Sequence, residues 1–220
     1  MSKREIPGFS YDGETQNKIL EKATELFALK GINSVSLRDI AKAVDIKMSS
    51  VQYYYKQKNA LFEDVLLHFE NGYRHYFDWL REENIRAESL EDLLGNLFNP
   101  EFVEMENPLG CLGMSLILKE QHANLLARER AFSLFHVFSI NRLSEDIDQL
   151  IKRNVLPPAN TKMIATLLML GVMATNDIRL HIYFGNEPPM DCTEIYGGIK
   201  EMIAQAFGRT INNALGVPHH

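Results

Sequence analysis

The chain has 220 residues, of which 45% are hydrophobic and 24% charged, and its formal net charge is −6. This length and balance allow one large or two small domains with a substantial core, and they exclude extended disorder except at the ends. The net charge alone argues against nucleic acid, but it hides a split. Residues 1–60 hold 10 Lys and Arg against 7 Asp and Glu, whereas residues 61–220 hold 13 against 22. The first quarter of the chain is therefore basic, as expected of a segment that meets phosphates.

Cysteine content and hydropathy bear on location. Cys111 and Cys192 are the only cysteines, and the N-terminal MSKREIPGFS lacks the apolar core of a secretion signal. The strongly apolar run around residues 164–174 has about half the length that a membrane-spanning helix needs. We therefore expect a cytoplasmic protein without a membrane segment.

Helical periodicity begins near residue 14. Ile19, Ala23 and Phe27 share one face of a helix predicted over residues 14–30, and Gly31 stands where that helix should stop.

A second, short helix is predicted over residues 37–44. The hydroxyl of Ser36 can cap it, and Asp39 places an acid in its first turn. The apolar period restarts with a shifted phase after Val44, so a turn is expected at Asp45 and a third helix over residues 47–54.

The rest of the chain keeps the helical period and shows no convincing strand. Further helices are predicted over residues 58–81, 88–98, 110–125, 127–153, 159–184 and 192–213. The predicted fold is all-α, with about nine helices. We expect an N-terminal helix-turn-helix head over residues 1–57 and a larger helical domain over residues 58–220.

The spacing around Ala41 is that of a helix-turn-helix. A small residue allows two helices to cross closely, the turn follows four residues later at Asp45, and Val51 can pin the second helix ten residues on. The turn position needs a positive φ and usually favours Gly. Asp is one of the few other residues enriched in that conformation.

The third helix would divide its side chains between two faces. Val51, Tyr54 and Tyr55 fall near the packing side, and the outward residues are Met48, Ser49, Ser50, Gln52 and Tyr53. Gln can read adenine, a phenol can reach phosphate, and the flanking Lys47, Lys56 and Lys58 supply positive charge. This pattern indicates DNA binding. The alternative is a surface helical hairpin whose tyrosines fill gaps, in a helical interaction protein that does not bind DNA.

Three segments carry a family resemblance. The stretch over residues 36–44, the tyrosine-rich end over residues 53–58 and the following Leu61-Phe62 resemble the tetracycline-repressor (TetR) family of transcriptional regulators. The resemblance covers about residues 14–65. It implies a three-helix DNA-binding head, a long fourth helix and a helical domain that binds an effector and forms a homodimer on a palindromic operator.

The resemblance also implies roles for individual residues. Arg38 would reach a guanine edge or a phosphate, Ser36 and Tyr54 would lie at the backbone, and Lys58 would clamp a phosphate. The residues that would face the major groove are Met48, Ser49, Ser50, Gln52 and Tyr53. Family members commonly carry an aromatic residue in place of Gln52 and Gly in place of Asp45 and Ser49, so base preference does not transfer.

Two apolar stripes near the C-terminus are candidates for the dimer face that the resemblance implies. Their members are Met163, Leu167, Leu170, Gly171 and Ala174 in one predicted helix, and Ile199, Met202, Ile203 and Ala206 in the next. Alternatively, these stripes complete the core of the monomer.

A region rich in aromatic residues, Met and His is the candidate effector site. Its members are Phe69, Tyr73, Phe77, Cys111, Met114, Phe132, Phe135 and His136. Such residues suit a largely apolar small molecule, but they also suit an ordinary core. Cys111 could be a redox or electrophile sensor or a packed, inert thiol. An effector would act by shifting the fourth helix, which carries Lys58.

Catalytic and metal sites find little support. Asp64, His68 and His75 can share a helix face, although solvated or pocket-lining histidines are the simpler interpretation. No catalytic constellation or cofactor motif stands out. We expect a non-enzymatic, ligand-responsive regulator, a repressor rather than an activator.

Overall fold

The computed structural model describes residues 15–98 and 109–183, with the backbone alone from residue 177. Six further residues, Glu194, Gly197, Gly198, Glu201, Met202 and Gln205, are described and helical. Every regular element in this part of the chain is a helix, so the all-α prediction is confirmed. The helix predicted over residues 192–213 otherwise lies outside the described residues. No helix in the described part is long and apolar enough to cross a membrane.

The chain divides into two compact units. Unit 1 comprises Met1–Tyr76 and Glu106–Leu134, and unit 2 comprises Phe77–Met105 and Phe135–His220. One boundary therefore falls within helix α4 (Lys58–Asn84). The functional division into a DNA-binding head over residues 1–57 and a larger helical domain over residues 58–220 stays a prediction.

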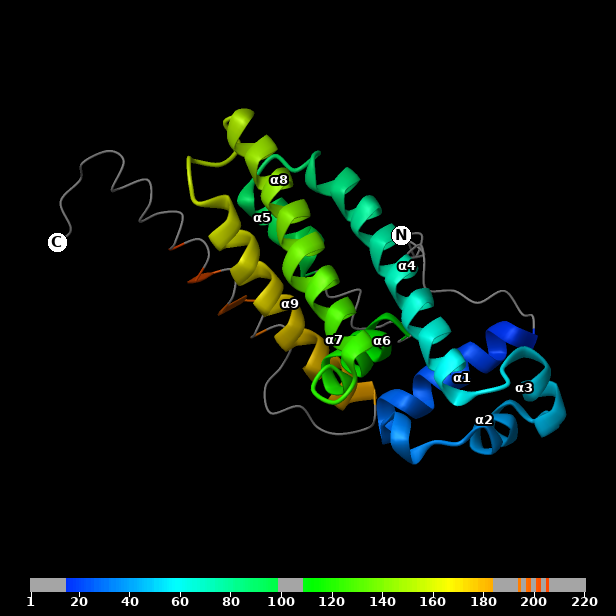
Figure 1. Ribbon diagram of the computed structural model, residues 1–220. Coiled ribbons are helices and arrows are strands. Elements are labelled where there is room, and N and C mark those ends of the chain that lie inside the picture. Colours follow the sequence, from blue (N-terminus) through cyan, green and yellow to red (C-terminus); the bar gives the residue numbers. More distant parts are fainter. Residues whose placement is uncertain are drawn as a thin grey trace, which may run out of the picture. The chain divides into compact units, whose positions relative to one another are not determined.

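Unit 1 is built around helix α1 (Thr15–Lys30). Helices α2 (Leu37–Val44) and α3 (Met48–Tyr54) lie together beside it and the first turns of α4 (Figure 1), and the short 3-10 helix η1 (Ile32–Ser34) links α1 to α2. Helix α6 (Leu109–Glu120) packs against α1, and α7 (Leu125–Ala131) packs against α6. The rings of Phe27 on α1 and Phe62 on α4 meet edge to face at 5.9 Å inside this core.

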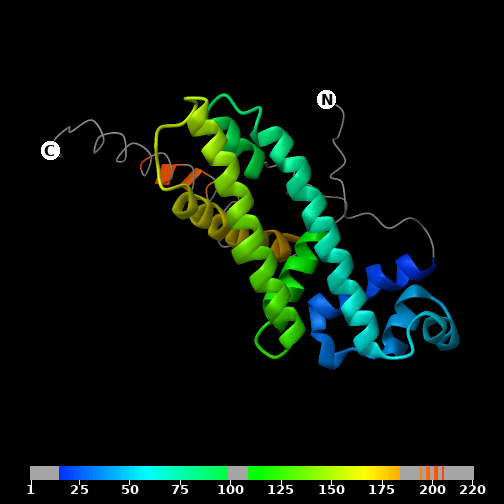
Figure 2. The ribbon, with the colours of Figure 1, turned by 45° about the horizontal axis from the view of Figure 1, so that its top comes forward.

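Unit 2 contains α5 (Leu90–Leu97), α8 (Ser139–Lys152) and α9 (Thr161–Tyr183). Helices α8 and α9 run side by side (Figure 1, Figure 2). Ile164 and Leu168 of α9 and Leu143 of α8 are among the residues buried in this unit.

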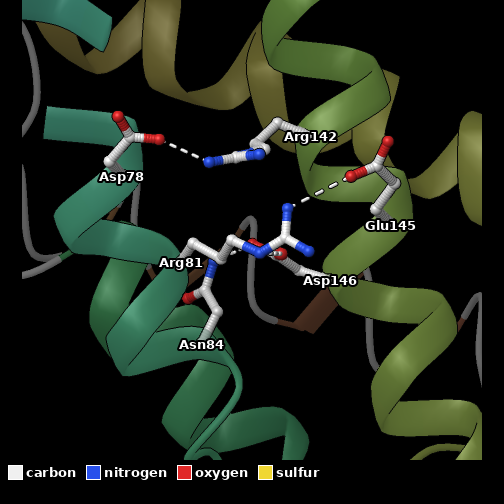
Figure 3. A network of polar contacts seen from close by, with 6 residues as sticks. All are labelled: Asp78, Arg81, Asn84, Arg142, Glu145 and Asp146. Atoms are coloured by element: carbon white, nitrogen blue, oxygen red, sulfur yellow. Dashed lines mark hydrogen bonds and ion pairs between the residues drawn. The ribbon is translucent and has the colours of Figure 1, made fainter. Parts of the chain in front are cut away.

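A polar network joins the end of α4 to α8 (Figure 3). Asp146 is 1% exposed, and its carboxylate accepts a hydrogen bond from Nδ2 of Asn84 at 2.9 Å. Arg81 pairs with Glu145 at 3.2 Å, and Arg142 pairs with Asp78. Burial raises the pKa of Asp146 despite these nearby cations, so its partners offset only part of the electrostatic cost of burying the carboxylate.

One predicted helix is wound differently from expectation. The sequence predicts a single helix over residues 127–153, whereas the structure has α7, then the π-helix η3 (Phe132–Phe138), then α8. A π-helix adds a residue to each turn, so the side-chain phase shifts along this stretch. As a result, Phe132 is 62% exposed and Phe135 is fully buried.

Candidate nucleic-acid interface

A capping box starts α2, as expected. Oγ of Ser36 accepts a hydrogen bond from the backbone N–H of Asp39 at 3.2 Å, and the backbone N–H of Ser36 donates to Oδ2 of Asp39 at 2.8 Å. The Ser36 hydroxyl and backbone donors hold the pKa of Asp39 below its usual value. Ile40 and Ala41 are buried and attach α2 to the core of unit 1. The reciprocal bonds fix the start of α2 at the surface of the head.

The turn between α2 and α3 has the predicted left-handed residue. Asp45 has φ 58° and ψ 46°, and its backbone N–H donates to the carbonyl of Lys42 at 3.3 Å. The N–H of Ile46 reaches back to the carbonyl of Ala41 at 3.0 Å. These bonds satisfy the end of α2 and turn the chain sharply into α3. The helix-turn-helix prediction is confirmed.

Helix α3 presents one face to the core and another to the surface. Val51 is fully buried and Tyr55, just after the helix, is 4% exposed, whereas Tyr53 is 81% exposed. Tyr54 departs from the packing role expected for it: it is 40% exposed, and its ring lies edge-on against that of Tyr53, with centroids 5.1 Å apart. The exposed aromatic pair therefore lies on the surface of the head.

Tyr55 holds the end of α3 in place. Its hydroxyl accepts a hydrogen bond from Nε2 of Gln16 on α1 at 3.1 Å and donates one to Oδ2 of Asp64 on α4 at 3.1 Å. Burial is the main reason that the pKa of Tyr55 rises to about 12, so the phenol stays neutral and remains a donor. One tyrosine thus links three helices, while its two neighbours remain exposed.

Lys58 begins α4 at the edge of a shallow hollow of about 360 Å³. Its Nζ donates a hydrogen bond to the backbone carbonyl of Ile32 at 2.7 Å, and the side chain is half-buried. The hollow is lined by Asn33, Ser34, Val35, Ser36, Leu37, Asp39, Lys56, Gln57 and Lys58. The contact of Lys58 with Ile32 has no local signal in the sequence, because the two residues are 26 positions apart.

None of the ten predicted DNA-contacting residues is buried. Seven are exposed: Ser36, Arg38, Lys47, Ser49, Gln52, Tyr53 and Tyr54. Three are half-buried: Met48, Ser50 and Lys58. They come from the start of α2, the length of α3 and the start of α4. The structure therefore brings them together on unit 1 as a surface that a partner can reach.

The predicted effector residues divide between the two units. In unit 1, Phe69, Tyr73, Cys111 and Met114 are buried. In unit 2, Phe77 and Phe135 are buried. The exposed pair, Phe132 and His136, does not join the buried groups. No cluster of three or more His, Cys, Asp or Glu within the described residues is placed to hold a metal ion.

Four of the five predicted dimer residues on α9 lie on one stripe at the surface of that helix. Met163 and Leu170 are 54% and 55% exposed, Ala174 is exposed and Leu167 is half-buried, whereas Gly171 is buried. In the following segment Met202 is 50% exposed, and Ile199, Ile203 and Ala206 lie outside the residues whose side chains are described. Helix α9 therefore shows an apolar stripe at the surface besides the face that it packs against α8.

Comparisons with known proteins agree with this geometry. Residues 19–65 match the family model described as "Bacterial regulatory proteins, tetR family". The chain is 35% identical over 80 residues to the probable HTH-type transcriptional regulator YttP of Bacillus subtilis (strain 168), covering 36% of this chain and 38% of YttP. It is 31% identical over 83 residues to the biofilm operon icaADBC negative transcriptional regulator IcaR of Staphylococcus epidermidis, covering 38% of this chain and 43% of IcaR.

Both alignments span less than half of the relatives' length. Over most of the chain the likeness is one of fold. A transcriptional regulator from Saccharomonospora viridis, solved in complex with choline, superimposes with a TM-score of 0.65 at 17% identity, covering 88% of this chain and 97% of that one. Residues 19–65 are therefore similar to the tetR family of bacterial regulatory proteins, and the chain shares the fold of this solved regulator.

Proposed function

We propose that the protein is a transcription regulator that binds operator DNA through unit 1 and acts as a repressor in the cytoplasm. The observation that carries this proposal is the two-faced α3: Val51 and Tyr55 hold the helix on the core, and the opposite face stays exposed. The major groove of B-form DNA admits a helix presented in this way. The repressor assignment draws on the likeness to IcaR, a negative regulator.

The exposed residues suit distinct contacts. Gln52 can pair with adenine, Met48 can meet a thymine methyl group, and Arg38 can reach guanine or phosphate. Lys47, Lys56 and Lys58 supply charge for the DNA backbone, and the hydroxyls of Ser49, Ser50, Tyr53 and Tyr54 can donate to phosphate or sugar. Phosphate contacts would set register and affinity, and Gln52 and Arg38 would set sequence preference.

The exposed stripe on α9 supports a homodimer. Apolar side chains such as Met163 and Leu170 are costly to leave in water, and a second copy of the same face would bury them. Two heads on one dimer could then read two half-sites about 34 Å apart on a palindrome. Dimer formation would therefore supply specificity that a single head lacks.

A small-molecule effector is the remaining part of the proposal. The buried aromatic and sulfur-containing groups around Phe69 and Cys111 in unit 1 suit a largely apolar ligand, and a protein of the same fold has been solved with choline. An effector that binds one conformation better by about 1–3 kcal/mol would change operator affinity by roughly 5- to 150-fold. We propose that it acts by shifting α4, and with it Lys58.

Selection of binding sites from random duplex DNA tests the function. A palindromic consensus is the expected result, and recovery of no consensus would favour the helical interaction protein instead. On the selected duplex, Lys58→Ala should weaken binding and lower the slope of log affinity against log salt by about one. The matched control is Lys152→Ala, which removes an exposed lysine of α8 and should change neither quantity.

Sedimentation velocity tests the dimer. Leu170→Lys places a charge in the exposed stripe of α9 and should shift the protein toward monomer at micromolar concentration. Leu125→Lys makes the same change at another exposed leucine, on α7, and should leave the dimer intact. A monomeric wild type, or equal behaviour of the two variants, would contradict this assignment of the dimer face.

A further inference from the structure

A chain of hydrogen bonds runs from the end of α6 to Lys58. Glu120, the last residue of α6, is 8% exposed, and its Oε1 accepts a hydrogen bond from the backbone N–H of Ile32 at 3.0 Å. The backbone carbonyl of the same residue, Ile32, accepts from Nζ of Lys58 at 2.7 Å. All three residues belong to unit 1. The backbone N–H of Ile32 is therefore bound by α6, and its backbone carbonyl binds Lys58.

The local backbone explains why this acceptor is needed. Gly31 ends α1 with φ 78° and ψ 151°, so the chain leaves the helical path before Ile32. Ile32 is 7% exposed, and a buried N–H without an acceptor is costly. Oε1 of Glu120 supplies the acceptor and lies only 3.4 Å from the position that a Cβ on Gly31 would take. The carboxylate therefore fixes the connection between α1 and η1.

The hydrogen bond to Ile32 affects the entropy that Lys58 loses when it binds a phosphate. A lysine has a long, flexible side chain, and ordering it on a ligand loses rotamer entropy. Its ammonium has three N–H donors, and the carbonyl of Ile32 takes one of them, which leaves two for another acceptor. A side chain already held in place loses less entropy on binding.

We propose that Glu120 is a positioning residue for DNA binding: through Ile32, it holds the ammonium of Lys58 where a phosphate of the duplex meets it. This inference rests on the proposed function. It assigns a role to a residue that is 88 positions from Ile32 and does not touch DNA itself.

Lys119 offers a matched control. Its Nζ donates to the backbone carbonyl of Ala28 at 2.9 Å, so it connects the end of α6 to α1. This bond involves neither Ile32 nor Lys58. Lys119→Met therefore removes a hydrogen bond of similar length from the same end of α6 and leaves the proposed relay intact.

The experiment measures affinity for the selected duplex by fluorescence anisotropy at several salt concentrations. Glu120→Ala should weaken binding about 3- to 30-fold, the range that the rotamer entropy of one long side chain allows. Glu120→Gln keeps the acceptor oxygen and should bind within about twofold of wild type, whereas Glu120→Asp keeps the charge but falls short of Ile32 and should bind weakly. Lys119→Met should match wild type.

A double-mutant cycle decides whether Glu120 acts through Lys58. The expected result is that Glu120→Ala weakens wild type but adds nothing in the Lys58→Ala background. An equal loss in both backgrounds would overturn the inference, as would a Glu120→Ala protein with wild-type affinity. If Glu120→Ala does not fold, comparing Glu120→Asp with Glu120→Gln decides the same question.

The outcome also separates this inference from the proposed function. If Lys58→Ala weakens binding and the Glu120 variants do not, the relay is wrong and the DNA-binding role stands. If wild type binds no selected duplex, or if Lys58→Ala binds as tightly as Lys152→Ala, the DNA-binding role fails and the inference fails with it.

Discussion

Gly113 on α6 lies against the ring of Phe69 on α4, so replacing it by Ala should destabilise the protein. A Cβ at Gly113 would lie 2.3 Å from Cδ2 and 2.8 Å from Cγ of Phe69. Non-bonded carbon atoms normally approach to about 3.5 Å, so the methyl group would be more than about 1 Å too close to Cδ2 of the ring. Phe69 is 3% exposed and packs on Tyr73 with ring centroids 5.5 Å apart, which leaves the ring little room to move.

Two opposing contributions set the change in unfolding free energy of Gly113→Ala. Replacing Gly by Ala inside a helix stabilises it by about 0.5–1 kcal/mol. Overpacking a buried site costs about 1–3 kcal/mol. The methyl group would clash with Cδ2 and Cγ of Phe69, which lie near the attachment of the ring and cannot easily move away. The upper part of the overpacking range therefore applies. We expect Gly113→Ala to lose about 1–2 kcal/mol of unfolding free energy.

Gly95 on α5 provides the matched control, since a Cβ there would meet nothing within 4 Å. Gly95→Ala should show the helix gain alone, about 0.5–1 kcal/mol. Urea denaturation followed by circular dichroism measures both variants. Phe69→Leu should cost less in the Gly113→Ala background than in wild type, because a smaller side chain makes room for the methyl group. A Gly113→Ala protein stabilised as much as Gly95→Ala would refute the close packing of α6 on α4.

Three further predictions concern stability, measured by the same urea denaturation. Tyr55→Phe loses the bonds to Gln16 and Asp64 and should cost about 1–3 kcal/mol. The pKa of Tyr55 is raised from 10.0 to about 12 in the folded protein, so wild type should lose the stability contributed by the phenol as pH rises between those values, whereas Tyr55→Phe should not. Parallel pH profiles of stability for the two proteins would contradict this expectation. The raised pKa of Asp146 means that the folded state binds the proton more tightly, so stability falls as pH rises through the folded pKa. Asp146→Asn should flatten this fall and be more stable than wild type near neutral pH, and an unchanged pH profile would count against it. Asp45→Val should cost about 1–2 kcal/mol, because a β-branched residue is strained at φ 58°, whereas Asp45→Asn should lie within about 0.5 kcal/mol of wild type; equal stability of the two would show that the turn is not left-handed.

Features of the head that depend on near neighbours could be predicted from the sequence. The Ser36 cap needs only Asp39, three residues on, and the turn needs only a residue that tolerates positive φ at Asp45. The burial of Val51 follows from the helical period. Such interactions form within one or two turns of the chain, so spacing in the sequence corresponds to distance in space.

Other features depend on packing between distant segments. Glu120 meets Ile32 across 88 positions, and no local pattern marks either residue as a partner of the other. The period over residues 127–153 predicts an unbroken α-helix, but the structure has the π-helix η3, with Phe135 buried and Phe132 exposed. Residue type alone therefore grouped effector candidates that the structure separates.

The sequence by itself determined the all-α class, the helix-turn-helix and the family resemblance, because each follows from periodicity, capping and turn chemistry over short stretches. Only the tertiary structure decided which apolar face of α9 is buried against α8 and which, with Met163 and Leu170, stays exposed. It likewise decided that Lys58 is held by Ile32. Both faces of α9 are hydrophobic and any backbone carbonyl can accept from a lysine, so only the packing of distant helices selects among these equivalent partners.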